Sequence, residues 1–269
     1  MKFSFSTLGC PDWPVEKVAA EAKRLKYDGV EIRGIKRVFD LSKAPEFSPE
    51  NIGKTRKLFE AAGIPVVSVN ASSSFCWPDQ AKQKAALEEA ERHIDIAAKM
   101  GAGFMRVFGG NIPDGEPREK WAKILAQHLS ICGEIAAKKG VTVIIESHDS
   151  WTRSDELVPV IKAANMPNVR ALWDMGNSFS KGEKFGDDAK LMKGYAVHVH
   201  IKDNLKDGKY CLLGKGVIPI ADAIRALKSI GFTGYMSLEW EKAWHAEIEE
   251  PEIAFPQAIE YLRSLDKAK

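Results

Sequence analysis

Cysteine is scarce and widely spaced in this chain. Four cysteines occur in 269 residues, and no two of them have the C-x-x-C spacing of a zinc knuckle or a redox pair. The charges nearly cancel, with 39 basic and 37 acidic side chains, so no bulk field attracts nucleic acid or an anionic membrane. We therefore expect buried or incidental thiols, and neither a nucleic-acid partner nor a membrane partner.

Long apolar runs and a dinucleotide-binding fingerprint are also missing. No stretch approaches the roughly 18 apolar residues of a membrane span, and Met1-Lys2-Phe3 enters a strand pattern without a secretory apolar region. No G-x-G-x-x-G follows the first strand pattern, which argues against an open doubly wound sheet. With 45% hydrophobic and 28% charged residues, the composition is that of a globular protein with a substantial core. We expect a cytoplasmic protein.

Strand and helix patterns alternate along the whole chain. Period-2 and 3.6-residue hydrophobic patterns predict strands at residues 2–7, 29–33, 66–70, 104–108, 141–146, 169–174, a segment ending at 200, and 235–240. Helices are predicted at residues 14–26, 49–62, 80–100, 117–139, 155–164, 187–193, 220–230 and 254–265. About eight βα units, with no linker between them, predict an α/β protein in which residues 1–269 form a single (β/α)₈ TIM barrel domain.

The connecting segments differ at the two ends of the predicted barrel. Links from a helix to the next strand are short and marked by glycine, as at Gly63 and Gly101. Links from a strand to the next helix are long and rich in polar and aromatic residues, at 71–79, 109–117, 175–186, 203–219 and 241–251. Functional groups are therefore expected at the carboxyl ends of the strands.

Polar side chains gather at those strand ends. In the stretch from His198 to Asp203, alternation places His198, His200 and Lys202 on one face and Val199 and Ile201 on the other. The same rule gives an inward polar set on the other strands: Glu31, Arg33, Asn70, Arg106, Glu146, His148, Asp174, Glu239 and Glu241. The apolar face would lie under the helices, and the polar face would form a site.

Three carboxylates and one imidazole in this set form a hard, mixed donor group. Glu146, Asp174 and Glu239 with His200 would suit Mn²⁺, Mg²⁺, Co²⁺ or Zn²⁺. Without a cation the carboxylates would repel one another. The alternative is a purely structural ion network, in which Arg33, Arg106 and Lys202 compensate the carboxylates. His148 and His198 are each open to a role as a substrate contact, as support for a ligand, or as a structural histidine, and a substrate or supporting role is favoured for His148.

Seven segments carry a resemblance to a known family. They are residues 5–9, 27–33, 106–110, 145–149, 172–174, 198–203 and 237–241, with the order Glu, Asp, H-x-H-x-K-D and L-E. Across nearly the whole chain they resemble the sugar phosphate isomerase/epimerase family of the xylose isomerase-like TIM barrel superfamily. The resemblance implies one divalent metal ion, with Mn²⁺ favoured, held by Glu146, Asp174, His200 and Glu239. It also implies that Glu146 and Glu239 exchange a proton at the carbon beside a substrate carbonyl.

The substrate-binding positions of related ketose epimerases are changed here. Those enzymes carry a histidine three residues after the metal-binding aspartate, where this chain has Asn177, and an arginine six residues after the metal-binding histidine, where it has Lys206. His148 is a candidate replacement. We therefore name His148, Lys202, Arg106, Arg33, Asn177 and Lys206 as candidate substrate-binding residues.

The expected function is isomerisation or epimerisation of a small sugar or polyol carbonyl compound through an enediolate. A lyase that eliminates a β-oxygen from a keto-sugar or keto-inositol is the alternative, as is a sugar-binding barrel without catalysis. A nuclease like endonuclease IV is disfavoured, because Asn70 and Arg106 stand where further metal-binding histidines are needed. Gly214-Lys215-Gly216 would either receive an anion or form a simple turn. A homo-oligomer is left open.

Overall fold

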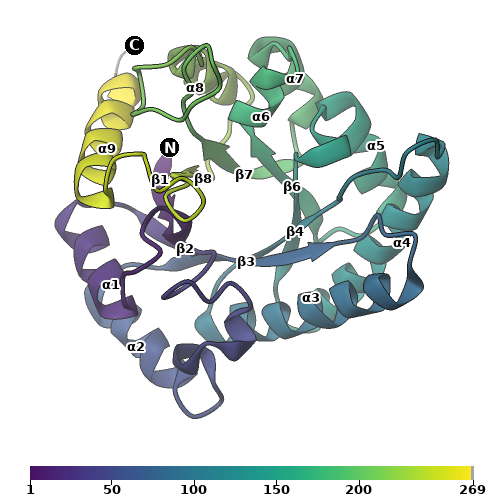
Figure 1. Ribbon diagram of the computed structural model, residues 1–269, viewed down its shortest axis with the longest axis horizontal. Coiled ribbons are helices and arrows are strands. Elements are labelled where there is room, and N and C mark those ends of the chain that lie inside the picture. The colour runs from purple at the N-terminus through teal and green to yellow at the C-terminus, as the bar shows by residue number, and fades with distance from the viewer. Residues whose placement is uncertain (268–269) are drawn as a thin grey trace.

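The computed structural model describes residues 1–267, and these form a closed barrel of parallel strands in the order β1 to β8 (Figure 1). The strands are β1 (Lys2–Ser6), β2 (Gly29–Ile32), β3 (Val66–Ser74), β4 (Phe104–Phe108), β5 (Thr142–Glu146), β6 (Val169–Asp174), β7 (Ala196–Ile201) and β8 (Tyr235–Leu238). Pairing of β1 with β8, with Phe5 opposite Leu238, closes the ring. The predicted single (β/α)₈ TIM barrel is confirmed.

Helices cover the outside of the barrel (Figure 1). They are α1 (Val15–Arg24), α2 (Ile52–Ala62), α3 (Gln80–Met100), α4 (Arg118–Ala137), α5 (Ser154–Ala164), α6 (Met175–Ser180), α7 (Phe185–Met192), α8 (Ile220–Ser229) and α9 (Pro251–Lys267). Four 3₁₀ turns lie in the described connections, at Thr7–Gly9, Leu41–Lys43, Pro45–Phe47 and Asp149–Trp151. Gly63 and Gly101 end α2 and α3 in the left-handed conformation, as their place in the sequence predicted.

The alternation in β7 sets the two sides of the barrel wall. Val199 and Ile201 are fully buried in the hydrophobic core, whereas His198 and His200 face the barrel interior. In the parallel register Asp174 of β6 lies opposite His200 of β7, and His200 lies opposite Ser237 of β8. Polar side chains from successive strands are therefore brought to one level at the carboxyl ends of the strands.

Three elements differ from the sequence prediction. β3 continues to Ser74, because after a register shift it pairs again with β4 at Phe108. The short helix α6 lies where a loop was expected, because the Asp174 carboxylate accepts a hydrogen bond from the Asn177 amide and caps its first turn. α9 begins at Pro251 rather than at 254, since proline is well suited to the first position of a helix.

The cysteines are free thiols, as expected: three are buried and Cys211 is half-buried. Among residues 1–267, no helix combines the length and the apolar character that a membrane span requires.

Candidate metal centre

Four side chains at the ends of neighbouring strands converge on one point inside the barrel mouth. Glu146 ends β5, Asp174 ends β6, His200 belongs to β7, and Glu239 follows β8. One donor atom from each lies within 4.8 Å of the donor atoms of the other three, and all four side chains are buried. The set that strand alternation selected from the sequence is therefore brought together by the fold.

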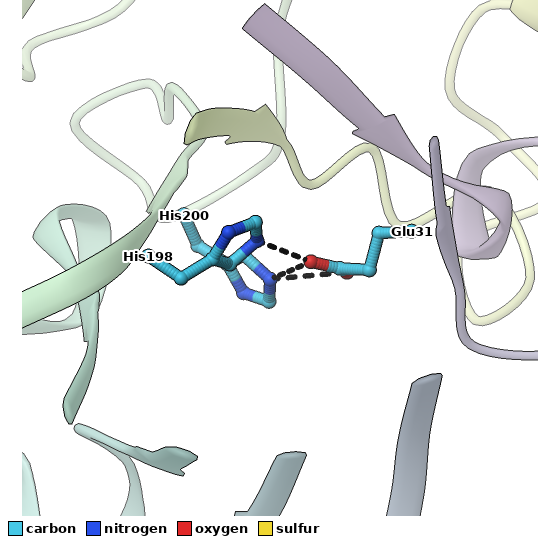
Figure 2. Close-up of side chains that lie close together, drawn as sticks. All are labelled: Glu31, His198 and His200. Carbon is cyan, nitrogen blue, oxygen red and sulfur yellow. Dashed lines mark hydrogen bonds and ion pairs between the residues drawn. The ribbon is translucent and has the colours of Figure 1, made fainter. Parts of the chain in front are cut away.

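His200 lies between two groups of carboxylates. Its Nδ1 atom is 3.1 Å from Glu239 Oε1 and 3.6 Å from Glu146 Oε1. Its Nε2 atom points the other way, 2.9 Å from Glu31 Oε2 (Figure 2). The imidazole thus presents Nδ1 to the carboxylate cluster and Nε2 to the deeper part of the barrel.

Lys202 reaches into the same cluster. Its Nζ atom lies 2.7 Å from Glu239 Oε2, 2.8 Å from Asp174 Oδ2 and 3.1 Å from Glu241 Oε1. Glu241 also accepts a hydrogen bond of 2.6 Å from the hydroxyl of Tyr210. We expected Lys202 to point toward substrate at the mouth, but its ammonium group is buried among carboxylates.

Two arginines lie on the other side of the cluster. Arg106 Nε is 3.2 Å from Glu146 Oε2, and Arg106 Nη1 donates to the carbonyl of Ala71. Arg33 donates from Nη2 to Ser72 Oγ, while its buried Nη1 atom makes no hydrogen bond within residues 1–267. Burial and the nearby Arg106 charge lower the pKa of Arg33 to about 9. The two guanidinium groups add positive charge beside Glu146.

The carboxylates of the cluster differ in their pKa values. Burial raises the pKa of Asp174 to about 7, even though Lys202 works against that shift. Burial also acts on Glu239, but His200 and Lys202 outweigh it and hold the pKa of Glu239 well below its usual range. In the same way Arg106 outweighs burial at Glu146 and lowers its pKa. Glu146 and Glu239 are therefore ionised at neutral pH and able to accept protons.

The free valences of the cluster fit a divalent cation. Within the described residues, Glu146 Oε2, Asp174 Oδ2 and His200 Nδ1 are buried atoms without a hydrogen bond of good geometry. Buried polar atoms without such partners are rare, and they are common features of ion sites. Three carboxylates and an imidazole suit Mn²⁺, Mg²⁺, Co²⁺ or Zn²⁺. Glu146, Asp174, His200 and Glu239 could therefore hold one divalent ion.

The other candidate substrate residues occupy different positions. His148 is partly exposed beside the cluster, with its Nδ1 atom 2.9 Å from Asp149 Oδ1 and its ring 4.9 Å from that of Phe108. Asn177 is tied to the backbone, because its side chain donates to the carbonyl of Ser147. Lys206 is exposed in the long loop after β7. The structure thus brings His148 near the cluster and leaves Lys206 on the surface.

The glycine pair after β7 forms a turn around an internal carboxylate. Asp203 is buried and accepts hydrogen bonds of 2.9 Å from the backbone amides of Gly214 and Gly216, and one of 3.1 Å from Ile218. These amides are already paired, so of the two alternatives for Gly214-Lys215-Gly216 the structure favours the turn.

Glu31 of β2 was not among the candidate site residues, although alternation placed it on the inward face. Its fully buried carboxylate accepts hydrogen bonds from both His198 and His200 (Figure 2). The signal available in the sequence was an acidic residue within the buried strand Gly29–Ile32, and such a residue requires an internal partner.

Comparison with known proteins identifies relatives over the full length. The chain is 23% identical over 278 aligned positions to fructoselysine 3-epimerase of Shigella flexneri, with 98% of each chain covered. It is 24% identical over 214 positions to inosose dehydratase of Geobacillus thermodenitrificans, covering 65% of this chain and 69% of that enzyme. Its fold matches the solved structure of the IOLI protein with a zinc atom, with a TM-score of 0.79, 19% identity, and 98% and 96% of the two chains covered.

A family model supports the same assignment. The model of the xylose isomerase-like TIM barrel matches residues 19–265, which include all four residues of the acidic and histidine cluster. The closed eight-stranded barrel agrees with that description. The chain therefore belongs to the xylose isomerase-like TIM barrel family.

Proposed function

We propose that this protein is a divalent-metal-dependent sugar isomerase or epimerase. Its substrate would be a small polyhydroxylated carbonyl compound, and the reaction would move a proton next to the carbonyl through an enediolate. The observation that carries the proposal is the convergence of Glu146, Asp174, His200 and Glu239 within 4.8 Å at the barrel mouth. The full-length similarity to a fructoselysine 3-epimerase supports it.

The four residues divide the work between binding and proton transfer. Asp174 and His200 would hold the metal ion together with Glu146 and Glu239. When bound, the ion would polarise the substrate carbonyl and stabilise negative charge on its oxygen. Glu146 and Glu239 are the catalytic pair: as ionised carboxylates, one would remove the proton and the other, once protonated, would return a proton to the opposite face.

Mn²⁺ is the cation that we favour, with Mg²⁺, Co²⁺ and Zn²⁺ as alternatives. The donor set contains three carboxylates and no thiolate, and hard oxygen ligands suit manganese and magnesium, whereas the imidazole also suits zinc and cobalt. The zinc atom in the solved structure of the similar IOLI protein supports a metal at such a barrel mouth. Metal analysis of the purified protein tests the assignment.

Charged side chains around the cluster would bind the substrate hydroxyl groups. Arg33 has a buried Nη1 atom without a hydrogen bond within the described chain, so it could donate to a substrate oxygen. Arg106, His148 and Lys202 lie beside the same carboxylates and would bind neighbouring oxygens. Asn177 and Lys206 remain candidates through the family positions that they occupy. A sugar or polyol is therefore the expected ligand, and a cytoplasmic location and a homo-oligomer remain hypotheses.

A lyase is the second candidate, and His148 favours it. Burial lowers the pKa of this imidazole, but the ion pair with Asp149 and the charge of Glu146 outweigh burial and raise it to about 9. His148 is thus protonated at neutral pH and could donate its proton to a departing β-oxygen after a glutamate removes the α-proton. The similarity to an inosose dehydratase agrees with this alternative.

Incubation with a panel of ketoses and keto-inositols in D₂O, with Mn²⁺ present, separates the two reactions. Exchange of a C–H for deuterium without loss of water supports the isomerase, and loss of water supports the lyase. Glu239→Gln should reduce the exchange rate by about 10² to 10⁴. Glu247→Gln, an exposed glutamate of the loop after β8, is the matched control and should keep the wild-type rate. If Glu239→Gln retains full activity, the assigned proton transfer is wrong.

A further inference from the structure

Glu31 crosses the barrel interior to contact two histidines of one strand. It belongs to β2, and the histidines belong to β7, which is not a neighbour of β2 in the barrel. Glu31 Oε2 lies 2.7 Å from His198 Nε2 and 2.9 Å from His200 Nε2, and Glu31 Oε1 lies 3.1 Å from His200 Nε2 (Figure 2). All three side chains are completely buried. The carboxylate is therefore a shared internal acceptor for both rings.

An ionised carboxylate can accept hydrogen bonds but cannot donate them. His200 Nε2 must therefore carry a proton in order to bond to Glu31. The other ring nitrogen, Nδ1, is the one that lies 3.1 Å from Glu239 Oε1 on the side of the carboxylate cluster. The contact with Glu31 thus determines which nitrogen of His200 is left to offer a lone pair to a cation.

His198 secures the carboxylate in this position. Its Nε2 atom makes the shortest of the three contacts with Glu31, and its ring packs 5.9 Å from the ring of Phe104. The Nδ1 atom of His198 has no hydrogen-bond partner among the described residues, which is the less costly state for an acceptor nitrogen than for a buried donor. His198 therefore orients Glu31, and Glu31 orients His200.

We propose that Glu31 is a positioning residue for the metal centre: it holds the proton on His200 Nε2, fixes the ring orientation and commits Nδ1 to the cation. This inference deepens the proposed function, because it rests on the four-residue metal site. It assigns a role to a residue that never touches the metal or the substrate. Such partners of metal-binding histidines commonly change metal affinity by about 10- to 100-fold when they are replaced.

The three side chains could instead bind a second ion of their own, since one donor atom from each lies within 4.8 Å of the others. The contacts of 2.7 and 2.9 Å between oxygen and nitrogen are hydrogen-bond lengths, however, and the rings are already joined to the carboxylate. The proposal therefore predicts one metal ion per chain, and a measured stoichiometry of two would count against it.

The test compares Glu31→Gln with Glu183→Gln. The first substitution places an amide donor at one of the two oxygen positions that accept protons from His200. Glu183 is the matched control, because it is also a buried glutamate that accepts two hydrogen bonds, from the backbone and hydroxyl of Ser154, but it lies outside the metal centre. Zn²⁺ affinity and stoichiometry are measured by competition with a chelator. The ¹⁵N spectra of the ring nitrogens are recorded on the Zn²⁺-loaded proteins.

Wild type and Glu183→Gln should bind one Zn²⁺ with equal affinity and show a protonated Nε2 on His200. Glu31→Gln should bind Zn²⁺ about 10- to 100-fold more weakly and show an altered His200 spectrum. If Glu31→Gln does not fold, Glu31→Asp, which keeps the charge but shortens the side chain, should show a smaller loss in the same direction. Wild-type affinity in both variants would overturn the inference. If wild type binds no Zn²⁺, Mn²⁺ or Co²⁺, the proposed function itself fails.

Discussion

Lys202 Nζ lies 2.8 Å from Asp174 Oδ2, inside the group of side chains that we propose to hold the metal ion. The same ammonium group is 2.7 Å from Glu239 Oε2. It therefore compensates part of the negative charge of the cluster in the metal-free protein, and it shares two carboxylates with the proposed cation. Removing the lysine should weaken the metal-free protein and increase its dependence on metal.

The substitution Lys202→Met tests this expectation. The variant leaves Asp174 and Glu239 without a cationic partner in a buried site, so the free energy of unfolding in the presence of a chelator should fall by about 3 kcal/mol. Added Mn²⁺ should raise the melting temperature of the variant by more than it raises that of wild type. Denaturant titrations and thermal melts with and without Mn²⁺ measure both effects.

Lys206→Met provides the control for that experiment, because Lys206 is an exposed lysine four residues farther along the chain. Its stability should stay within about 0.5 kcal/mol of wild type, with or without Mn²⁺. Equal stability of the Lys202 and Lys206 variants would show that the ion pairs of Lys202 contribute nothing to the metal-free fold.

Gly176 gives Lys202 the space that it needs. A Cβ atom at this position of α6 would lie 2.6 Å from Lys202 Cγ and 3.0 Å from Lys202 Cε. Gly176→Ala should therefore displace the lysine side chain and destabilise the protein by about 1 to 3 kcal/mol. Gly186→Ala, at a helical glycine with open space around it, should instead stabilise by about 0.5 kcal/mol. Denaturant unfolding of the two variants would contradict this reasoning if both changes had the same sign.

Glu183 predicts a pH dependence that is independent of the metal centre. Burial, with the nearby charge of Asp188, raises the pKa of Glu183 above its usual 4.5 in the folded protein. The folded state then binds more protons than the unfolded state above pH 4.5, so this contribution to stability is fully present below that pH and is lost as the pH rises through the folded pKa. Glu183→Gln removes the titrating group.

The free energy of unfolding of wild type and Glu183→Gln should therefore be measured between pH 4 and pH 8 with a chelator present. Wild type should lose stability relative to the variant as the pH rises. A constant difference across this range, or a relative gain by wild type, would mean that the carboxyl group of Glu183 is not destabilised by burial.

Local pattern was sufficient to predict most of the barrel and the acidic cluster. The helix Gln80–Met100 and the strand Phe104–Phe108 were predicted with their observed bounds, because long periodic segments end there at clear glycine signals. Asp174 and Glu146 were predicted to meet because both end parallel strands, and strand ends of a barrel share one mouth. That inference needs only alternation and strand order.

The contacts made by side chains across the interior could not be predicted in the same way. Glu31 meets His200 across 169 positions of sequence, and the contact depends on barrel closure and on the rotamers of both residues. Lys202 was predicted to face inward, but alternation does not say whether a flexible side chain turns toward substrate or toward Asp174. Lys206 was chosen from its offset in a family pattern, and a position in a long loop does not determine where its side chain lies.

The two histidines of β7 should have unequal effects on metal binding. His200 presents Nδ1 to the carboxylate cluster, whereas the contact of His198 is with Glu31, one step farther from the proposed ion. His200→Ala should weaken Mn²⁺ binding by more than about 100-fold, and His198→Ala by about tenfold or less. His93→Ala, which removes a buried histidine of α3 outside the cluster, is the control for loss of packing alone.

Titration calorimetry with Mn²⁺ on the three variants measures these affinities, and thermal melts confirm that each is folded. All three should lose stability because each replaces a buried ring, so stability alone cannot distinguish them. Metal affinity can, since the donor atom is lost only in His200→Ala. Retention of tight binding by His200→Ala together with loss of binding in His198→Ala would show that the inward register assigned to β7 is wrong, and with it the tautomer inferred for His200.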